Sequence, residues 1–466
     1  MTRNRAVLWG LVLLLAARLL AMFLVPLTDS TEARYAEIAR KMVETGNWIT
    51  PQFDYGVPFW AKPPLHTWLS ALGIEAFGPS PFAARLGILV SAIATLAILW
   101  MWASTFTDRK TASIATLVAA SSAVFFVSSA FVQTDMVLTL GVTASMAGYY
   151  GGIRGSRAWG WLFFLGLAIG LLAKGPIAVI LSLLPIFVWV VWYRQWKNLA
   201  HLPWIAGTVA CLVLSVPWYV AAEIATPGFL HYFLIGEHIQ RFLQPGWKGD
   251  LYGAGREHFR GAIWLFWIGA ALPWSLSLPV LAWRLRKGGA AQAEQAPLHL
   301  YLLLFAITPM VFFTAAANVL LAYVLPGIPA AALLAVLLWQ RTGSSGAREL
   351  TLGVAAMLLI SLGLSIACLT PAGRSALPTE AYLVAAYPGQ GRLAILEARS
   401  FSAEFYTQGK ITRIGTPAEL AQWLAPGDGV LVPKRKREAA MAAVGDTLQF
   451  VAEDRKYLLF VKCCKE

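Results

Sequence analysis

About eleven apolar segments, each long enough to cross a lipid bilayer, restrict what this chain can fold into. A transmembrane helix needs roughly 17–25 mostly apolar residues. Only helices and closed barrels cross bilayers, because every backbone polar group there must be bonded within the protein. The segments lie near residues 6–27, 81–105, 111–130, 134–152, 159–173, 175–193, 203–222, 259–282, 298–317, 319–340 and 349–370. With 58% hydrophobic and 13% charged residues, we expect an all-α polytopic membrane bundle.

The basic residues of the short loops alternate along the chain. If the N-terminus, with Arg3 and Arg5, is cytoplasmic, every second short loop carries arginine or lysine and the intervening loops carry almost none. This is the positive-inside pattern of membrane proteins. It predicts that residues 28–80, residues 223–258 and the C-terminal tail lie on the outer face of the membrane. The net charge of +13 then reflects topology, and we expect no nucleic-acid partner.

The character of the chain changes after about residue 371. Short apolar runs there alternate with helical patterns, which is typical of alternating strands and helices. The prediction is a transmembrane domain over residues 1–370 followed by a small α/β domain over 371–466 on the outer face. Because the tail has no Gly-rich phosphate loop, we expect it to be accessory.

The polar stretch of residues 29–68 is too long for a simple connector between spans. It is rich in aromatic residues, among them Tyr35 and Trp60, and we expect it to lie on the membrane surface as the lid or wall of a site. Two carboxylates open it. Their spacing is typical of a capping box, with Asp29 as N-cap and Glu32 reaching back, although both could also accept a proton or hold a sugar hydroxyl.

Lys62 lies in the same stretch and precedes two prolines. Pro63 and Pro64 restrict the backbone to an extended form, so the lysine is held in place. A fixed ammonium near the headgroup plane suits a lipid-linked phosphate. The alternative is a lysine that snorkels to the interface.

Two further charges lie at predicted outer turns. Asp135 opens the predicted span 134–152, where a carboxylate is costly unless it is paired or faces a water-filled cavity. Lys174 lies in an Ala-Lys-Gly-Pro turn, and such helix breakers are tolerated where a turn lines a cavity. The two residues either belong to a site or form an ion pair that ties two helical hairpins together.

Other charged residues give weaker signals. Arg18 and Arg85 lie in the first two predicted spans, where arginines face the bundle interior or snorkel outward, and we expect an interior position for Arg18. In the second outer loop, His238 lies between Glu237 and Arg241, which share one helical face. A lone histidine is more often structural than a ligand, and no metal-binding spacing is present. We therefore expect that no metal or other cofactor is required.

Several of these residues lie in motifs whose order resembles a known family. In chain order the motifs are TEARYAEIARKM, GNWITP, GVPFWAKPPL, AARL, QTDM, AKGP, EHIQRF and PWS. They resemble the bacterial branch of the dolichyl-phosphate-mannose–protein mannosyltransferases and, within it, the aminoarabinose transferases that modify lipid A. The resemblance covers roughly residues 5–340. It implies a GT-C glycosyltransferase that uses a polyprenyl-phosphate sugar as donor.

The resemblance also implies an inverting transfer to an acceptor such as lipid A or another envelope glycan. Lys62 would neutralise the leaving phosphate, with Lys174 or Arg85 in support. Glu32, with Asp29 or Asp135, would orient the acceptor or act as general base. The remaining candidates for substrate or lipid binding are Tyr35, Trp60, Glu237, His238, Arg241 and Tyr323.

Three positions depart from the family pattern. The acidic pair, usually adjacent in the family, is separated here, so its role is carried to Glu32 more firmly than to Asp29. The acidic residue that precedes the Lys-Pro-Pro lysine in aminoarabinose transferases is Ala61, which argues against a metal site. A late lysine of the relatives is replaced by Val319. The donor sugar or the acceptor can therefore differ from the lipid A case.

Two other classes of protein compete with this interpretation. A transporter or flippase of a lipid-linked sugar needs the same basic phosphate-binding residues, but transporters tend to show internal repeats and broken or charged spans near mid-membrane. No repeat is found here, and the polar residues gather at the predicted outer face. A non-enzymatic scaffold would leave that charged cluster unexplained, so the sequence favours the glycosyltransferase.

Overall fold

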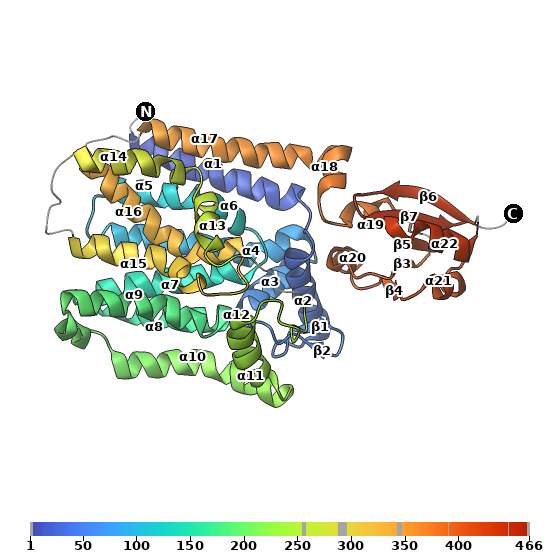
Figure 1. Ribbon diagram of the computed structural model, residues 1–466, viewed down its shortest axis with the longest axis horizontal. Helices are drawn as coiled ribbons and strands as arrows, with labels where there is room; N and C mark the ends of the chain where they lie inside the picture. Colours follow the sequence, from blue (N-terminus) through green and yellow to red (C-terminus); the bar gives the residue numbers. More distant parts are fainter. Residues whose placement is uncertain are drawn as a thin grey trace.

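The computed structural model describes residues 3–253, 258–287, 296–342, 347–389, 391–445 and 447–463. Its long helices run side by side in one bundle, and a small sheet domain stands at one end of that bundle (Figure 1). The predicted outer loop 223–258 and the predicted C-terminal domain include residues 254–257, 390, 446 and 464–466, which lie outside the described residues. The first polar stretch lies between the bundle and the sheet domain, as Figure 1 shows.

Each predicted apolar segment coincides with a helix or a pair of helices. The helices of the bundle are α1 (Arg3–Leu24), α4 (Pro81–Ala103), α5 (Arg109–Ala120), α6 (Ala123–Ser128), α7 (Thr134–Gly152), α8 (Arg157–Lys174), α9 (Ile177–Tyr193), α10 (Trp204–Ala225), α13 (Ala262–Ala270), α14 (Leu278–Lys287), α15 (Ala296–Phe313), α16 (Ile328–Arg341) and α17 (Ala347–Ala367). The 3-10 helices η1 (Trp196–His201), η3 (Trp274–Ser277) and η5 (Leu321–Gly327) connect them.

The predicted number of spans is not confirmed. Among the described residues, seven helices are long and apolar enough to cross a membrane, and the pair around Pro273, bent by 96°, would make an eighth. The segment 111–130 is divided into α5 and α6, and α9 has only 17 residues with Pro185 inside it. These breaks account for two of the three predicted segments that do not qualify; the third is α7, which has 19 residues but is rich in glycine, serine and threonine.

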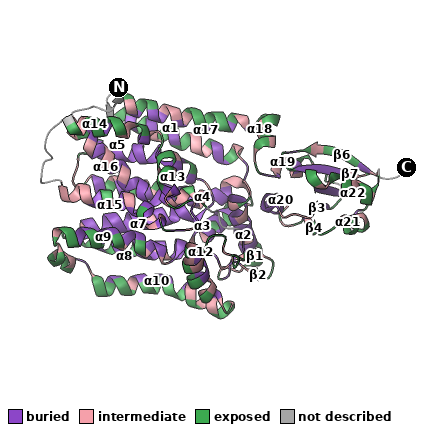
Figure 2. Cartoon of the chain, in the orientation of Figure 1, coloured by how far each residue is buried: buried purple, intermediate pink, exposed green. Residues whose placement is uncertain are grey.

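Helix α7 is the most enclosed element of the bundle, with almost every residue buried (Figure 2). It is rich in glycine, serine and threonine, because a helix surrounded by other helices needs close packing more than an apolar surface. A Cβ at Gly148 would lie 2.3 Å from the backbone nitrogen of Phe163 on α8. Glycine at this position therefore lets the two helices approach each other closely, and α7 presents Asp135 at its first turn.

The first polar stretch forms α2 (Thr31–Thr45), the hairpin of β1 (Gln52–Asp54) and β2 (Val57–Pro58), and α3 (Leu65–Phe77). Helix α2 is buried over most of its length, including the charged side chains of Glu37 and Lys41. It is covered because α3 and the C-terminal helix α20 (Phe401–Tyr406) both pack against it. Helix α2 is thus enclosed by other parts of the protein, and its place at the membrane surface stays a prediction.

The capping box predicted before α2, with Asp29 as its N-cap, is wrong. The residue that precedes the helix is Ser30, whose side chain makes no capping bond. The carboxylate of Glu32 accepts from the backbone N–H of Thr28 at 3.2 Å. Asp29 points to the C-terminal domain, where its Oδ2 accepts from two serine hydroxyls at 2.9 and 2.7 Å. These long-range bonds take the place of the local cap.

The second outer segment is a short helical stretch beside the first. It consists of α11 (Phe229–His231), the π-helical turn η2 (Tyr232–Gln240) and α12 (Arg241–Leu243). Glu237 and Arg241, which were predicted to share one helical face, form an ion pair at 3.0 Å.

The C-terminal domain contains a five-stranded sheet of order β4-β3-β5-β7-β6. Its elements are α18 (Pro371–Ala376), α19 (Ala381–Ala386), β3 (Leu393–Leu396), α20, β4 (Thr412–Ile414), α21 (Pro417–Trp423), β5 (Gly429–Pro433), η6 (Lys434–Lys436), α22 (Arg437–Val444), β6 (Leu448–Glu453) and β7 (Tyr457–Lys462). Strands β3, β4 and β5 are parallel, and β7 pairs antiparallel with β5 and β6. The central strands β3 and β5 are fully buried, with apolar clusters on both faces of the sheet. The small α/β domain predicted from the apolar runs is therefore present.

Candidate functional site

Two cavities meet at the end of the bundle that faces the C-terminal domain. One, here called the apolar groove, has a volume of about 410 Å³ and is lined mainly by isoleucine and phenylalanine side chains of α9, η2 and α15. The other, here called the polar chamber, has a volume of about 350 Å³ and is lined by residues of α2 and of the segment that follows β2, among others. Five residues line both cavities: Lys62, Lys174, Arg241, Asn318 and Tyr323. A cationic wall thus separates an apolar compartment from a polar one.

Lys62 contributes its ammonium to this wall from the extended segment after β2. Its Nζ donates to Glu237 Oε2 at 2.7 Å and to the carbonyl oxygen of Ala61 at 2.6 Å. Arg241 donates to the same buried carboxylate at 3.0 Å. Burial would raise the pKa of Glu237, but the charges of Lys62 and Arg241 outweigh it and lower the pKa below its usual range. The carboxylate stays ionised and holds both cations in place.

Asp135 and Lys174 lie at the first turn of α7 and the last turn of α8. Lys174 Nζ donates to Asp135 Oδ1 at 2.5 Å and lies 4.2 Å from the ring centroid of Tyr323. The ion pair that was weighed against a functional role is therefore present. Both side chains nevertheless line the polar chamber, so the pair ties two helices together and faces the site as well.

Glu32 and Arg85 form a second buried pair, away from the polar chamber. Arg85 donates from Nε and NH2 to the two carboxylate oxygens of Glu32 at 2.8 and 2.9 Å, and further to carbonyls at the end of α1. Neither residue lines the chamber or the groove; both line a third cavity of about 310 Å³, together with Arg18. Arg18 donates to the carbonyl oxygens of Val127 and Ala130, at 2.5 and 2.8 Å.

The other predicted residues are distributed unevenly. Tyr35 lines the polar chamber, and its ring packs edge-on against that of Phe59. His238 lines the apolar groove, and burial lowers the pKa of this histidine. Trp60 lines neither cavity and instead donates from Nε1 to Thr226 Oγ1 at 3.0 Å, which fastens the two outer segments to each other.

Several residues of the chamber were not predicted. Arg34, Asp250, Tyr252 and Phe401 line it, and Arg34 NH1 donates to the backbone oxygen of Tyr252 at 2.6 Å. They come from three separate parts of the chain, and of the four only Arg34 lies in one of the motifs of the sequence. Asn318, which precedes Val319, was not predicted either; its Oδ1 is buried and has no hydrogen-bond partner among the described residues.

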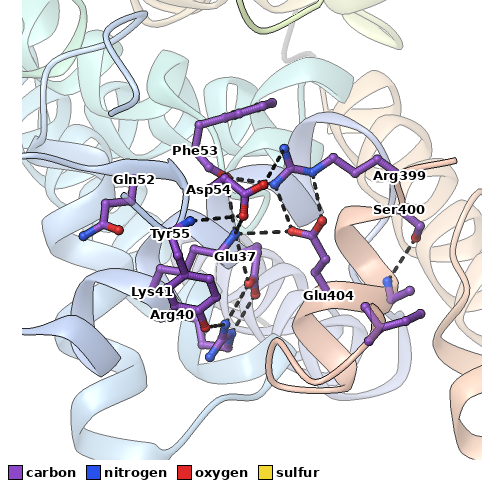
Figure 3. A network of polar contacts seen from close by, with 12 residues as sticks. Glu37, Arg40, Lys41, Gln52, Phe53, Asp54, Tyr55, Arg399, Ser400 and Glu404 are labelled. Atoms are coloured by element: carbon purple, nitrogen blue, oxygen red, sulfur yellow. Dashed lines mark hydrogen bonds and ion pairs between the residues drawn. The ribbon is translucent and has the colours of Figure 1, made fainter. Parts of the chain in front are cut away.

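A network of charges joins α2 to the C-terminal domain beside the chamber (Figure 3). Lys41 Nζ lies 3.3 Å from Glu404 Oε2, 3.5 Å from Glu37 Oε1 and 3.9 Å from Asp54 Oδ1. Arg399 donates to both carboxylate oxygens of Glu404, at 2.8 and 3.0 Å. The spacing of Glu37 and Lys41 on one helix could have indicated the local half of this network. Within the part of the chain that the structure describes, no three His, Cys, Asp or Glu side chains gather as a metal site would require.

The fold of the whole chain is similar to that of crystal structures of ArnT from Cupriavidus metallidurans. For the structure bound to undecaprenyl phosphate, the TM-score is 0.76 at 20% identity, over 99% of this chain and 98% of that one. The apo structure gives a TM-score of 0.75 at the same identity. The chain therefore shares the fold of these structures, a multi-pass bundle of membrane helices with a small C-terminal domain. Residues 7–233 further match the family described as dolichyl-phosphate-mannose-protein mannosyltransferase, which is the family that the motifs of the sequence resemble.

Curated relatives share the same part of the chain. An undecaprenyl phosphate-alpha-4-amino-4-deoxy-L-arabinose arabinosyl transferase of Aeromonas hydrophila is 32% identical over 65% of this chain and 54% of its own length. The enzyme of that name from Edwardsiella ictaluri is 30% identical over 75% of this chain and 63% of its own length. The chain thus spans a little more than half of the length of the relatives it matches.

Proposed function

We propose that this chain is an integral membrane glycosyltransferase that moves a sugar, with inversion, from a polyprenyl-phosphate donor to an envelope glycan or lipid. The observation that supports this most is the cationic wall between the apolar groove and the polar chamber. A polyprenyl-phosphate sugar has the same three parts in the same order: an apolar chain, an anion and a polar ring. The names of the relatives, which include undecaprenyl phosphate, support the same donor class.

The donor phosphate would lie against Lys62, Lys174 and Arg241, with its isoprenoid chain in the groove and its sugar in the chamber. As the acceptor oxygen bonds to the anomeric carbon, the bond from that carbon to the phosphate oxygen breaks. The phosphate then gains a second negative charge, which the ammonium groups stabilise in a partly buried site. The main tasks of the protein are therefore to position the donor and to neutralise this charge.

Asp135 is the acidic residue that we assign as general base, because its carboxylate lines the chamber. It would accept the proton that the acceptor hydroxyl loses. Glu32, Asp29 and Arg85 were assigned to the site on resemblance, and we now assign them positioning roles, since their side chains are bound elsewhere. Tyr323, beside Lys174, would contact the donor at the wall.

Two of the three positions that depart from the family pattern line the chamber. Ala61 and Val319 are buried there, where aminoarabinose transferases are expected to carry an acid and a lysine. The chamber of this chain is therefore less charged at these two positions. We infer that its donor sugar or its acceptor differs from aminoarabinose or lipid A.

The site would lie on the outer face of the bacterial inner membrane. The basic loops, such as that at Arg109 and Lys110, would lie in the cytoplasm, as the alternation of charge favours. On this orientation residues 1–370 form the membrane domain, and residues 371–466 form an α/β domain outside.

The test uses undecaprenyl phosphate as the probe. We expect Lys62→Ala to weaken binding of undecaprenyl phosphate to the purified protein by at least about tenfold, which is about 1.4 kcal/mol, because one of three cations is lost. The control is Lys110→Ala, which removes an exposed lysine far from the groove and should leave binding unchanged. Binding by Lys62→Ala at the wild-type level would contradict the assignment of the phosphate site.

A second measurement separates transfer from transport. Mass spectrometry of envelope lipids and glycans, from cells with and without the protein, should show a sugar modification that Lys62→Ala abolishes. An unchanged glycoform profile with an altered distribution of lipid-linked sugar across the membrane would favour a flippase instead.

A further inference from the structure

We propose that the C-terminal domain supplies part of the substrate site, with Phe401 as a residue that contacts the saccharide acceptor. This inference rests on the proposed function and adds a residue that the relatives' motifs do not include. Phe401 is the first residue of α20, and its side chain lines the polar chamber together with residues of α2 and of the segment after β2. The domain that the sequence predicted to be accessory thus reaches the site.

The segment that carries Phe401 is fastened on both sides. Before it, Arg399 NH2 donates to the backbone oxygen of Phe53 at 2.8 Å, and its guanidinium lies 4.4 Å from the Phe401 ring centroid. On either side of it, the hydroxyls of Ser400 and Ser402 donate to Asp29 Oδ2 at 2.9 and 2.7 Å. Residues 399–402 are therefore held by the first outer segment, so the position of Phe401 is defined by contacts outside its own domain.

The ring of Phe401 extends an aromatic surface. Its centroid lies 5.5 Å from that of Phe53, which lies 5.0 Å from that of Tyr252, and Tyr252 lies 4.7 Å from Phe59. Phe59, Tyr252 and Phe401 all line the chamber. Aromatic faces bind the apolar C–H face of a sugar ring and leave its hydroxyls free for polar partners. The ligand class that fits this surface is therefore a saccharide.

The position of this surface favours the acceptor over the donor. The donor phosphate would lie at the wall shared with the groove, and none of Phe59, Tyr252 and Phe401 belongs to that wall. Arg34 also lines the chamber outside the shared wall, and it has no carboxylate partner among the described residues. The aromatic surface thus belongs to the part of the chamber that the donor phosphate leaves open.

The test compares three substitutions at one position with a matched control. Phe401→Ala and Phe401→Leu remove the aromatic face, whereas Phe401→Tyr retains it. The control Phe450→Ala removes an exposed phenylalanine from β6 of the same domain. For each variant we measure undecaprenyl phosphate binding and thermal unfolding of the purified protein, and the sugar modification in cells by mass spectrometry.

We expect Phe401→Ala and Phe401→Leu to lower the modification by about tenfold, with binding of undecaprenyl phosphate unchanged. Phe401→Leu should also unfold at the wild-type temperature, and both Phe401→Tyr and Phe450→Ala should modify normally. Full modification by Phe401→Leu would overturn the proposal, as would a parallel loss of binding or stability in every Phe401 variant. If the wild-type protein itself neither binds undecaprenyl phosphate nor modifies an envelope component, the proposed function has failed instead.

Discussion

Asp135 and Glu32 are both buried carboxylates paired with a basic residue, yet their surroundings differ. Asp135 faces a polar chamber, where water and substrate can solvate a charge. Glu32 is 1% exposed and is bound by a guanidinium that also holds three carbonyl oxygens of α1 and the turn after it. Removing one partner of a fully buried pair leaves an uncompensated charge, which costs about 3–5 kcal/mol. The same chemical change should therefore affect catalysis at one site and stability at the other.

We expect Asp135→Asn to lower transfer by at least about a hundredfold, the usual contribution of a general base, with little change in thermal unfolding.

We expect Glu32→Gln to lower the unfolding temperature, and the double variant Glu32→Gln/Arg85→Met to recover part of that loss, since it removes the unpaired cation. Thermal unfolding in detergent and the cellular sugar modification check both. If the Glu32→Gln protein is stable but inactive, the positioning role is contradicted and Glu32 is a catalytic residue.

At the scale of elements, the contact between the turn before α2 and the C-terminal domain depends on a shared proton. Oε2 of Glu380 accepts from the hydroxyls of Ser400 and Ser402, both at 2.5 Å, and these hydroxyls also reach Asp29. Each hydroxyl has one proton and can donate to one carboxylate at a time, so a proton on Glu380 would supply a third donor, directed to Asp29. Burial, followed by the hydrogen bond and charge of Asp29, raises the pKa of Glu380 to about 7.

This raised pKa makes the contact sensitive to pH. A carboxyl whose pKa rises on folding contributes stability below the ordinary range near pH 4.3, and that contribution is lost as the pH rises through about 7. The other charged or titratable groups whose pKa values Glu380 influences are Asp454, Lys456 and Tyr457.

The unfolding temperature should therefore fall between pH 5 and pH 8, and Glu380→Gln, which keeps a hydrogen-bond donor at all pH values, should reduce this fall. Glu453→Gln, which changes an exposed carboxylate on β6, is the matched control and should behave like the wild type. Equal pH dependence in Glu380→Gln would contradict the shared proton.

For the whole molecule, the sequence predicted what local patterns can specify. Apolar runs located the helices, and Asp135 and Lys174 were found because each lies at the boundary of a span and a turn. Asp29 was misinterpreted, since its partner Ser400 lies 371 positions along the chain and a local cap was the nearest alternative. Phe401 and Tyr252 have no distinctive neighbours in sequence and enter the site through tertiary packing. The count of eleven spans was not confirmed, since hydropathy along the sequence does not show where a buried helix breaks.

The orientation of the molecule is a prediction at this scale. In a background whose four cysteines are replaced by serine, Lys410→Cys should react with a membrane-impermeant maleimide in intact spheroplasts. Lys110→Cys should react only after permeabilisation, because its loop belongs to the basic, cytoplasmic set. Both side chains are exposed, so accessibility reports the side of the membrane. The reverse labelling pattern would contradict the orientation.

The cationic wall has a consequence for turnover. On the proposed reaction, the spent carrier remains in the apolar groove, against the same lysines that received the donor, and it now carries one more negative charge. The spent carrier must leave the groove and return to the outer leaflet before another donor can enter. Spent carrier and new donor therefore compete for the same groove. The speed of this enzyme would then depend on how quickly the cell clears used carrier from the outer leaflet, and a slowdown in that recycling would reduce glycosylation without any change in the protein.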